Sequence, residues 1–370
     1  MNSDKIKILY LVLEMDLGGL QRIVNQLINK IDRNRFIPYL CCIDRGGLFY
    51  EQLGKNSIKT YVLRRRPGPF DTRLLARLYN ILRKNKIDII HSQSGCTLYA
   101  ALAGRLARIK GIIHTEHGRL VPDKKPAIIE DRLSSLLINQ VVGVSEELTE
   151  YLASVVKISS KKLITIINGV DTHKFTPLNT DQRKDLRNAM GLGERDKIIG
   201  TVCRLDPVKN LEFLIKCMPS IFGAVPKCKL LIVGDGPGKE NLIKYAQGLG
   251  VDSKVIFTGQ RMDVEKVLPV FDIYICTSLS EGTSMTILEA MSCGLPIVAS
   301  AVGGNSKLVD SSNGLLFPLN DAETFKRHII GLLKKPELLN VMGRNSRKKV
   351  EINFNLNKMV KQYEKLYCSV

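Results

Sequence analysis

The densest set of residues that could do chemistry lies between residues 280 and 296. Two glutamates, Glu281 and Glu289, bracket a run of small or hydroxyl-bearing residues that ends in a methionine: Gly282, Thr283, Ser284 and Met285. Thr283 or Ser284 could cap a helix here, and the free N–H groups at a helix start form a ready phosphate site. Glu289 would lie inside that helix among apolar neighbours, where a carboxylate needs hydrogen-bond donors.

The spacing of the two glutamates fits a nucleotide sugar. If both lie on helical geometry, eight residues at about 1.5 Å each separate them by about 12 Å along the axis. That length resembles the span from a sugar ring across a diphosphate to a ribose. Glu281 would then accept from sugar hydroxyls, the amides of residues 282–285 would meet the diphosphate, and Glu289 would accept from ribose hydroxyls. The plainer alternative is a surface glutamate and a helical glutamate paired with a lysine.

A second cluster supplies positive charge. Arg204 and Lys209 flank a turn and could converge on a pyrophosphate, the arginine in a bidentate way and the lysine as a point charge. Nowhere in the chain are two aspartates separated by one residue, so the simple acidic metal site of many sugar-transfer enzymes is missing. We therefore expect no metal and no other cofactor, because the two cations and a helix dipole would neutralise a leaving diphosphate. Ordinary surface positions are the alternative.

Of two glycine-rich loops, the sequence favours only the first as a ligand site. Gly18 and Gly19 stand between the first predicted strand and the first predicted helix, where paired glycines let a backbone approach a ligand closely. The run from Gly234 to Gly238 also follows a strand, but Pro237 spoils it as a dinucleotide site. A plain turn is the favoured interpretation of that second loop.

Two histidines end predicted strands in the first half of the chain. His117 precedes a glycine, would point into a ligand cleft, and could hydrogen-bond the transferred sugar or the acceptor near the reacting carbon. A purely structural role is its alternative. His91, followed by Ser92, Gln93 and Ser94, could line the acceptor side, but a structural role is favoured for this histidine.

The elements that must position these residues alternate between β-rich runs and amphipathic helical stretches. The predicted strands of the first half are Ile6–Leu13, Ile37–Ile43, Lys59–Leu63, Ile87–His91, Gly111–His114, Gln140–Val144 and Leu163–Ile167. Those of the second half are Ile198–Cys203, Lys229–Val233, Val255–Thr258, Ile273–Cys276, Pro296–Ala299 and Gly314–Phe317. Apolar strands separated by helices indicate α/β domains with a parallel sheet covered on both faces. Ligands in such folds bind at the carboxyl ends of the strands.

Two blocks of this rhythm predict two doubly wound domains whose strand ends face one cleft. A turn signal at Asn168–Asp171 places the boundary between an acceptor-side domain, residues 1–170, and a donor domain, residues 171–350. Residues 351–370 contain an amphipathic helix that could pack on either domain.

The bulk charge is the unusual property of this chain of 370 residues. The formal net charge is +19, and basic residues gather between Arg64 and Lys86 and again between Arg105 and Lys110. A solvated helix face and a patch for an anionic membrane surface are equally open interpretations. Nucleic acid is not expected, because no nucleic-acid-binding motif accompanies the charge. With no signal peptide and no run of spanning length, we expect a cytoplasmic protein, with peripheral attachment to the inner face of the membrane left open.

These residues together resemble family 4 of the glycosyltransferases, the large retaining family with the GT-B fold. The similarity rests on the two glutamates, the cations Arg204 and Lys209, the Gly18–Gly19 loop and the Asn168–Asp171 hinge. It covers nearly the whole chain and is densest from residue 200 to residue 317. The segment Glu281–Gly304 is its most specific part.

The resemblance implies a role for each site residue. Arg204 and Lys209 would hold the donor diphosphate, Glu281 the donor sugar and Glu289 the ribose. The base would lie beside the loop that carries Gly259, Gln260 and Arg261. Gly18 or Gly19 would contact the phosphate when the domains close, and His117 would match the active-site histidine of the first domain. The family keeps the anomeric configuration without metal, and the leaving phosphate takes the proton of the acceptor.

The resemblance also implies a substrate class, with one departure. We expect transfer of a hexose or N-acetylhexosamine from a nucleotide sugar, UDP favoured, to a lipid-linked or glycan acceptor in cell-envelope polysaccharide or lipopolysaccharide synthesis. Cys203 replaces a common glycine, and Thr283 and Ser284 replace a bulky residue and a glycine, which leaves sugar specificity open. The alternatives are a UDP-sugar epimerase of the same architecture and a basic protein that binds membrane or nucleic acid.

Overall fold

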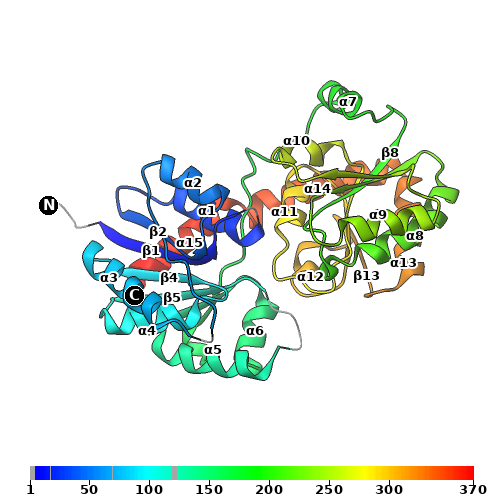
Figure 1. The fold of residues 1–370 in the computed structure, drawn as a ribbon. Coiled ribbons are helices and arrows are strands. Elements are labelled where there is room, and N and C mark those ends of the chain that lie inside the picture. The colour runs from blue at the N-terminus through cyan, green and yellow to red at the C-terminus, as the bar shows by residue number, and fades with distance from the viewer. Residues whose placement is uncertain (1–4, 17, 69, 119–122) are drawn as a thin grey trace. The chain divides into compact units, whose positions relative to one another are not determined.

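The computed structural model describes residues 5–16, 18–68, 70–118 and 123–370, which form two compact units (Figure 1). The first unit contains the chain up to Asn168 together with Asn357–Val370, and the second is Gly169–Leu356. Each unit has one fully parallel sheet with helices on both faces, so the predicted pair of doubly wound domains is confirmed.

The first unit is built on a seven-stranded sheet of order β3-β2-β1-β4-β5-β6-β7. Its strands are β1 (Ile6–Glu14), β2 (Phe36–Arg45), β3 (Lys59–Val62), β4 (Ile89–Gln93), β5 (Gly111–Glu116), β6 (Gln140–Gly143) and β7 (Leu163–Thr165). Each overlaps a strand that the sequence predicted. Its helices are α1 (Gly19–Lys30), α2 (Leu48–Lys55), α3 (Thr72–Asn85), α4 (Thr97–Leu106), α5 (Lys125–Leu137), α6 (Glu146–Ser154) and α15 (Leu356–Ser369), with a short 3-10 turn at Ser160–Lys162.

Helices α3 to α6 cover one face of this sheet, and α1 and α2 cover the other (Figure 1). The local sequence explains α3 well. Asp71 caps it by accepting from the backbone N–H groups of Arg73 and Leu74, and three leucines one turn apart, Leu74, Leu78 and Leu82, are buried. They pack in one apolar cluster with Leu9 and Ile90 of the central strands.

The last helix, α15, belongs to the first unit, a placement that the sequence left open. His91 on β4 is buried and links α15 to the sheet. Its Nδ1 lies 2.7 Å from the hydroxyl of Tyr367 on α15, and its Nε2 lies 2.7 Å from Oγ1 of Thr115 on β5. The Tyr367 hydroxyl also donates to that of Tyr10 at 3.2 Å. His91 is therefore a structural residue that fastens α15 to the sheet, and the acceptor-side role considered for it is wrong.

The second unit has a six-stranded sheet of order β10-β9-β8-β11-β12-β13. The strands are β8 (Lys197–Val202), β9 (Cys228–Val233), β10 (Val255–Gly259), β11 (Ile273–Cys276), β12 (Ile297–Ser300) and β13 (Gly314–Phe317). The helices are α7 (Thr180–Ala189), α8 (Leu211–Ala224), α9 (Lys239–Gly248), α10 (Val264–Val267), α11 (Met285–Ser292), α12 (Asn305–Leu308), α13 (Ala322–Leu333) and α14 (Pro336–Asn353), with 3-10 turns η2 (Pro207–Lys209) and η3 (Leu268–Val270).

Strand order brings the loops after β8 and β11 side by side, because these two strands pair directly through Ile199–Ile273 and Gly200–Tyr274. The loops after β10, β9 and β12 open at the same carboxyl edge of the sheet. This edge therefore carries every site residue that the sequence predicted in the second half, apart from the buried Glu289. Within the described part of the chain, no helix is both long and apolar enough to cross a membrane.

Candidate active site

Lys209 and Glu281 meet at the carboxyl edge of the second sheet. Lys209 ends η2 after β8, and Glu281 lies in the loop after β11. The Lys209 Nζ atom donates to Oε1 of Glu281 at 2.7 Å, and the two side chains are only 24% and 12% exposed. A half-buried ion pair from two separate loops thus forms where a ligand of this fold would bind.

The Glu281 carboxylate has a second donor that the sequence did not single out. Ser278 Oγ donates to the same Oε1 atom at 2.6 Å. Two donors on one oxygen fix the orientation of the carboxylate. Burial by itself would lower the pKa of Lys209, but the nearby Glu281 carboxylate outweighs burial and raises that pKa. Lys209 therefore carries its positive charge throughout the physiological range.

Main-chain contacts hold the two loops in this register. Oγ1 of Thr277 donates to the Lys209 carbonyl oxygen at 2.8 Å, and the Leu279 amide donates to the Val208 carbonyl oxygen at 2.8 Å. Both contacts join the loop after β8 to the loop after β11. The position of the ion pair is therefore set by the backbone and not by the two flexible side chains alone.

The glycine pair at Gly303 and Gly304 packs against the backbone of the loop that carries Glu281. Gly303 has a φ of +46°, and a Cβ atom there would lie 1.9 Å from the carbonyl oxygen of Glu281. The Gly304 amide donates to the Gly282 carbonyl oxygen at 3.0 Å. Only a residue without a side chain allows this approach at position 303, which explains Gly303 at the end of the Glu281–Gly304 segment.

Helix α11 begins at the second of the two caps that the sequence offered. Ser284, and not Thr283, is its N-cap: Ser284 Oγ accepts from the Ile287 amide, and the helix runs from Met285. Glu281 and Gly282 therefore lie in the loop before it. The two glutamates do not share one helix, and the 12 Å axial spacing derived for them is wrong because the chain from Glu281 to Ser284 is not helical.

Glu289 lies on α11 and is fully buried, with 0% of its surface exposed. It differs in this from Glu281, which reaches the edge of the sheet. Next to it, burial and then the Glu289 carboxylate raise the pKa of the Cys293 thiol. The helix thus buries a carboxylate among its apolar neighbours, as the sequence indicated.

Arg204 lies on the same loop as Lys209 but points elsewhere. Its side chain is 73% exposed, and its Nε lies 3.9 Å from Oδ2 of Asp206. The loop itself is held by the glycine run after β9. The φ of Gly234 is +138°, a Cβ atom there would lie 1.8 Å from the Cys203 carbonyl oxygen, and the Leu205 amide donates to the Asp235 carbonyl oxygen at 2.9 Å. The glycine run is the turn that the sequence favoured.

The loop predicted to lie beside the base follows β10. Gly259 ends this strand with a φ of +72°, and its carbonyl oxygen accepts from the Gly234 amide at 2.9 Å. Gln260 is exposed. Arg261 pairs with Asp263 at 2.7 Å, so its guanidinium is already engaged.

In the first unit, Gly18 is the N-cap of α1 and Gly19 is its first residue. Gly18 is extended, with a φ of −175°, so its conformation alone does not demand glycine. Both residues follow β1 and open at the carboxyl edge of the first sheet. Leu17, between this pair and the strand, lies outside the described residues.

His117 sits at that same carboxyl edge, just after β5. Its Nε2 lies 2.7 Å from Oε1 of the buried Gln93, and its backbone amide donates to Ser94 Oγ at 2.9 Å and to Oε1 of Glu116 at 3.2 Å. Ser94 Oγ donates to Oε1 of Glu116 at 2.5 Å. Burial lowers the pKa of His117 to about 4, against the opposing effect of Glu116. The imidazole is therefore neutral near pH 7.

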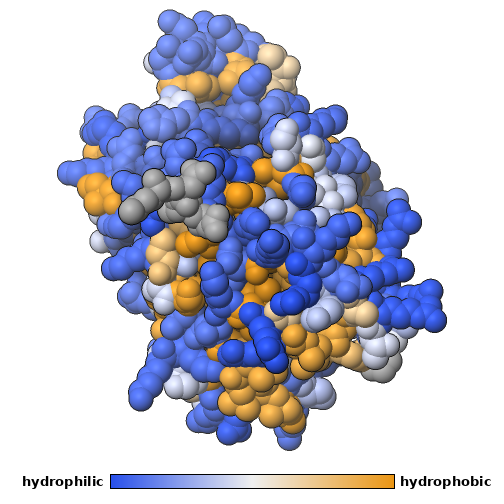
Figure 2. Space-filling model, turned by 90° about the vertical axis from the view of Figure 1, so that its left-hand side faces the viewer, coloured by the Kyte–Doolittle hydropathy of each residue, from blue (hydrophilic) through white to orange (hydrophobic). Residues whose placement is uncertain are grey.

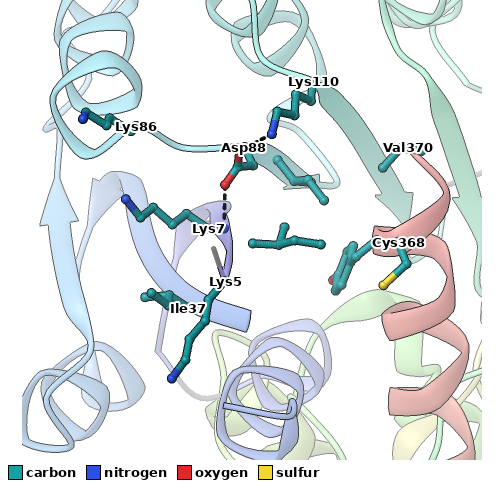
Figure 3. A pocket seen from close by; sticks show the side chains of 11 residues that line it. Lys5, Lys7, Ile37, Lys86, Asp88, Lys110, Cys368 and Val370 are labelled. Atoms are coloured by element: carbon teal, nitrogen blue, oxygen red, sulfur yellow. Dashed lines mark hydrogen bonds and ion pairs between the residues drawn. The ribbon is translucent and has the colours of Figure 1, made fainter. Parts of the chain in front are cut away.

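Two cavities lie away from these residues. One of about 680 Å³ opens at the amino edge of the first sheet, among Lys5, Lys7, Lys86 and Lys110 (Figure 3). There Asp88 pairs with Lys110 at 3.0 Å and accepts from the Lys7 amide. A second, of about 530 Å³, lies in the second unit beside Lys197, the first residue of β8, and beside Asp272 and Pro296, which precede β11 and β12. Among the described residues, no three His, Cys, Asp or Glu side chains are grouped as metal ligands.

Comparison with known proteins assigns both halves of the chain. Residues 17–174 match the model "Glycosyltransferase Family 4", and residues 182–349 match "Glycosyl transferases group 1". The chain is 28% identical to the Escherichia coli UDP-Gal:alpha-D-GlcNAc-diphosphoundecaprenol alpha-1,3-galactosyltransferase, with 99% of this chain and 97% of that protein covered. It is 28% identical to the N-acetyl-alpha-D-glucosaminyl L-malate synthase of Bacillus anthracis, covering 82% and 80%.

A solved structure has the same fold. The Anabaena protein Alr3699/HepE in complex with UDP superposes with a TM-score of 0.87 at 21% identity, over 99% of this chain and 100% of that one. Together, the two family models and the paired parallel sheets show that this chain belongs to the family 4 type of glycosyltransferases, with the GT-B fold.

Proposed function

We propose that this glycosyltransferase moves a hexose or N-acetylhexosamine from a UDP-sugar to a lipid-linked or glycan acceptor in cell-envelope polysaccharide synthesis, lipopolysaccharide included. The Lys209–Glu281 pair carries the proposal, because it sets a cation and an oriented carboxylate side by side at a strand end. The E. coli relative, which spans nearly the same length, uses UDP-galactose and a diphosphoundecaprenol acceptor.

The two charged residues of the pair would bind different parts of the nucleotide-sugar donor. Glu281 would accept hydrogen bonds from the sugar hydroxyls, while the Lys209 ammonium would donate to the diphosphate oxygens. The exposed Arg204 guanidinium and the amides at the start of α11, residues 282–285, would bind the same diphosphate. Glu289 would bind the ribose, Gly259, Gln260 and Arg261 would surround the base, and Gly18 or Gly19 would contact the phosphate.

We further propose that the reaction retains the anomeric configuration and needs no metal. The bond between the anomeric carbon and the diphosphate breaks, the acceptor oxygen bonds to that carbon on the same face, and the acceptor proton goes to a phosphate oxygen. Lys209 supports this route, since its raised pKa keeps a positive charge beside the departing oxygens. His117, neutral at pH 7, would hydrogen-bond the transferred sugar or the acceptor without exchanging a proton.

A panel of UDP- and GDP-sugars in a thermal-shift assay tests the donor. A ligand at about 100 times its Kd stabilises the folded state by about 2.7 kcal/mol and raises Tm by about 5 to 10 °C. We expect a UDP-sugar to give this shift in the presence of EDTA, and a lipid-linked acceptor to receive the sugar. A shift with GDP-sugars alone would contradict the UDP assignment.

Analysis of the product separates transfer from the alternative chemistry. A transferase links the sugar to the acceptor, whereas an epimerase of the same architecture leaves an isomeric UDP-sugar and no new glycosidic bond. Conversion of the donor without any acceptor product would therefore overturn the proposal. The basic first unit suggests that the acceptor lies on an anionic inner membrane surface, with the enzyme attached peripherally.

A further inference from the structure

Helix α5 presents a row of large apolar side chains to solvent. Ile129, Leu133 and Leu136 are 57%, 59% and 68% exposed. They stand four and three residues apart, so all three lie on one face of the helix. Other sides of the helix already supply the contacts that fold the unit: Ser134 and Ser135 are buried, and Ile128 and Leu137 pack against its core. The exposed row is therefore not needed for folding.

The end of α4 extends the same apolar surface. Leu106, the last residue of α4, is 61% exposed. Its neighbour Arg105 donates from Nε to the Leu137 carbonyl oxygen at 2.7 Å, which places the ends of α4 and α5 side by side. We call Leu106, Ile129, Leu133 and Leu136 the α5 stripe. Figure 2 shows hydrophobic residues gathered near the lower edge of the face it draws.

Basic side chains surround the α5 stripe. Lys162 donates from Nζ to the carbonyl oxygens of Ser135 and Leu136 at 2.7 and 3.0 Å, beside Arg105 at the end of the same helix. Other exposed basic residues on these segments are Arg108, Lys124, Lys125, Arg132 and Lys161. The acidic residues along α5 and just before it are Asp123, Glu130 and Asp131. The segments that carry the α5 stripe thus have more basic than acidic residues, and two of the basic side chains, Arg105 and Lys162, contact the end of α5 itself.

The positive charge of the chain is also distributed unevenly between the two units. The first unit has 30 of the 55 Lys and Arg residues and 16 of the 36 Asp and Glu residues. The second unit has the other 25 basic and 20 acidic residues. Most of the positive excess is therefore on the unit that bears the α5 stripe. A partner that covers this surface should be apolar within and anionic at its boundary, which describes the interface of an anionic lipid bilayer.

Helix α5 follows in the chain directly after the strand that leads to the candidate acceptor side. It follows β5, whose carboxyl end carries His117, so the helix starts at the same edge of the sheet. A bilayer against α5 would hold a lipid-linked acceptor near that edge.

We propose that the α5 stripe docks the first unit on an anionic bilayer, with Leu106, Ile129, Leu133 and Leu136 in the interfacial layer and the bordering lysines and arginines on the lipid phosphates. The inference deepens the proposed function, since its biological sense rests on a lipid-linked acceptor. Its physical basis is the exposed row itself.

The test is sedimentation of the full chain with vesicles. Wild-type protein should pellet with phosphatidylglycerol-containing vesicles and much less with pure phosphatidylcholine vesicles. Raising the salt from about 0.1 M to about 1 M shortens the Debye length from about 10 Å to about 3 Å and should release most of it. Leu133→Glu should weaken the partition coefficient about tenfold or more.

Two controls guard against a folding defect. Ile352→Glu makes the same kind of change at a 58% exposed site on α14 of the second unit, and it should bind vesicles as wild type does. The double variant Ile129→Ser, Leu136→Ser removes apolar surface without adding charge and should also lose binding. Each variant should keep the wild-type Tm and the wild-type rate of UDP-sugar hydrolysis in solution.

Equal vesicle binding by Leu133→Glu and wild type would overturn the proposal, as would equal binding to neutral and anionic vesicles. A wild-type dimer that Leu133→Glu dissociates, with no vesicle binding by either, would instead identify the α5 stripe as a contact between copies of the chain. Vesicle binding by a protein that responds to no nucleotide sugar would leave the surface standing and refute the proposed function.

Discussion

The Nζ atom of Lys209 lies 2.7 Å from Oε1 of Glu281, although the two residues are 72 positions apart in the chain. Each comes from a loop after a different strand, and the pairing of β8 with β11 brings those loops together. The pair is polar, half-buried and backbone-supported. These properties suit a pair of residues that binds a charged ligand in a fixed position. Substituting either residue should therefore have a measurable effect.

Lys209→Ala should lower kcat/KM for sugar transfer about 100- to 1000-fold, the usual cost of removing one donor that stabilises developing charge. Its ammonium would no longer face the diphosphate, and Glu281 would lose one of its two close donors and keep Ser278. The matched control is Lys326→Ala, whose Lys326–Glu323 pair lies on α13 away from the site, so this change should leave kcat/KM at the wild-type value. Equal activity of both variants would remove Lys209 from the site.

Gly303→Ala should destabilise the second unit and reduce activity together. The new Cβ would lie 1.9 Å from the Glu281 carbonyl oxygen at a φ of +46°, so the loop must shift, at a cost of about 1 to 3 kcal/mol or more. Gly331→Ala on α13 is the control, because nothing lies within 4 Å of its Cβ position. That helical change should stabilise by about 0.5 to 1 kcal/mol. Urea unfolding measures both, and effects of the same sign would contradict the strain argument.

The pKa of His117 predicts how stability changes with acid. Its folded-state pKa is about 4, below the ordinary value of 6.5, so the unfolded chain binds the proton more readily. The stabilisation is therefore complete above about pH 6.5 and is lost as the pH falls toward 4. Buried His91, whose pKa is also lowered by burial, acts in the same direction.

Urea midpoints at pH 7 and pH 5 should show a loss of stability that is smaller in His117→Gln, which does not titrate. The NMR titration of the His117 ring should have its midpoint well below pH 6. A midpoint near 6.5 would show that the ring is more exposed to water than the structure has it.

Tyr367→Phe should cost about 1 to 3 kcal/mol of folding stability, because it leaves the Nδ1 atom of buried His91 without its partner at 2.7 Å. Tyr79→Phe, at a partly buried tyrosine of α3, should change stability by about 0.5 kcal/mol or less. Chemical denaturation compares the two. If the two variants were equally stable, the Tyr367 hydroxyl would not be what fastens α15 to the sheet.

Local patterns in the sequence were enough to predict the two sheets. Runs such as Ile6–Leu13 and Ile273–Cys276 are apolar on both sides, which only a sheet covered on both faces can bury. The same patterns placed Lys209 and Glu281 after strands, and therefore at one edge. They could not show that Ser278 would be the second donor to Glu281, because a serine in a loop has no periodicity.

The error over Glu281 and Glu289 has a physical cause. The spacing estimate extended helical geometry back to Glu281, although both caps that the sequence offered, Thr283 and Ser284, lie after that residue. In the structure Ser284 is the cap, so Glu281 belongs to the loop. The contact of Gly303 with the Glu281 backbone fixes the loop before it, and that contact lies 22 residues further along the chain.

The sequence by itself determined the strands, their alternation with helices, the family resemblance and the strand ends where charged residues gather, because these depend on the pattern of neighbouring side chains. Only the tertiary structure decided which charges meet, that Arg204 points to solvent, that His91 fastens α15, and that the apolar row of α5 stays exposed. Such facts follow from packing between segments far apart in the chain, and no local pattern encodes them.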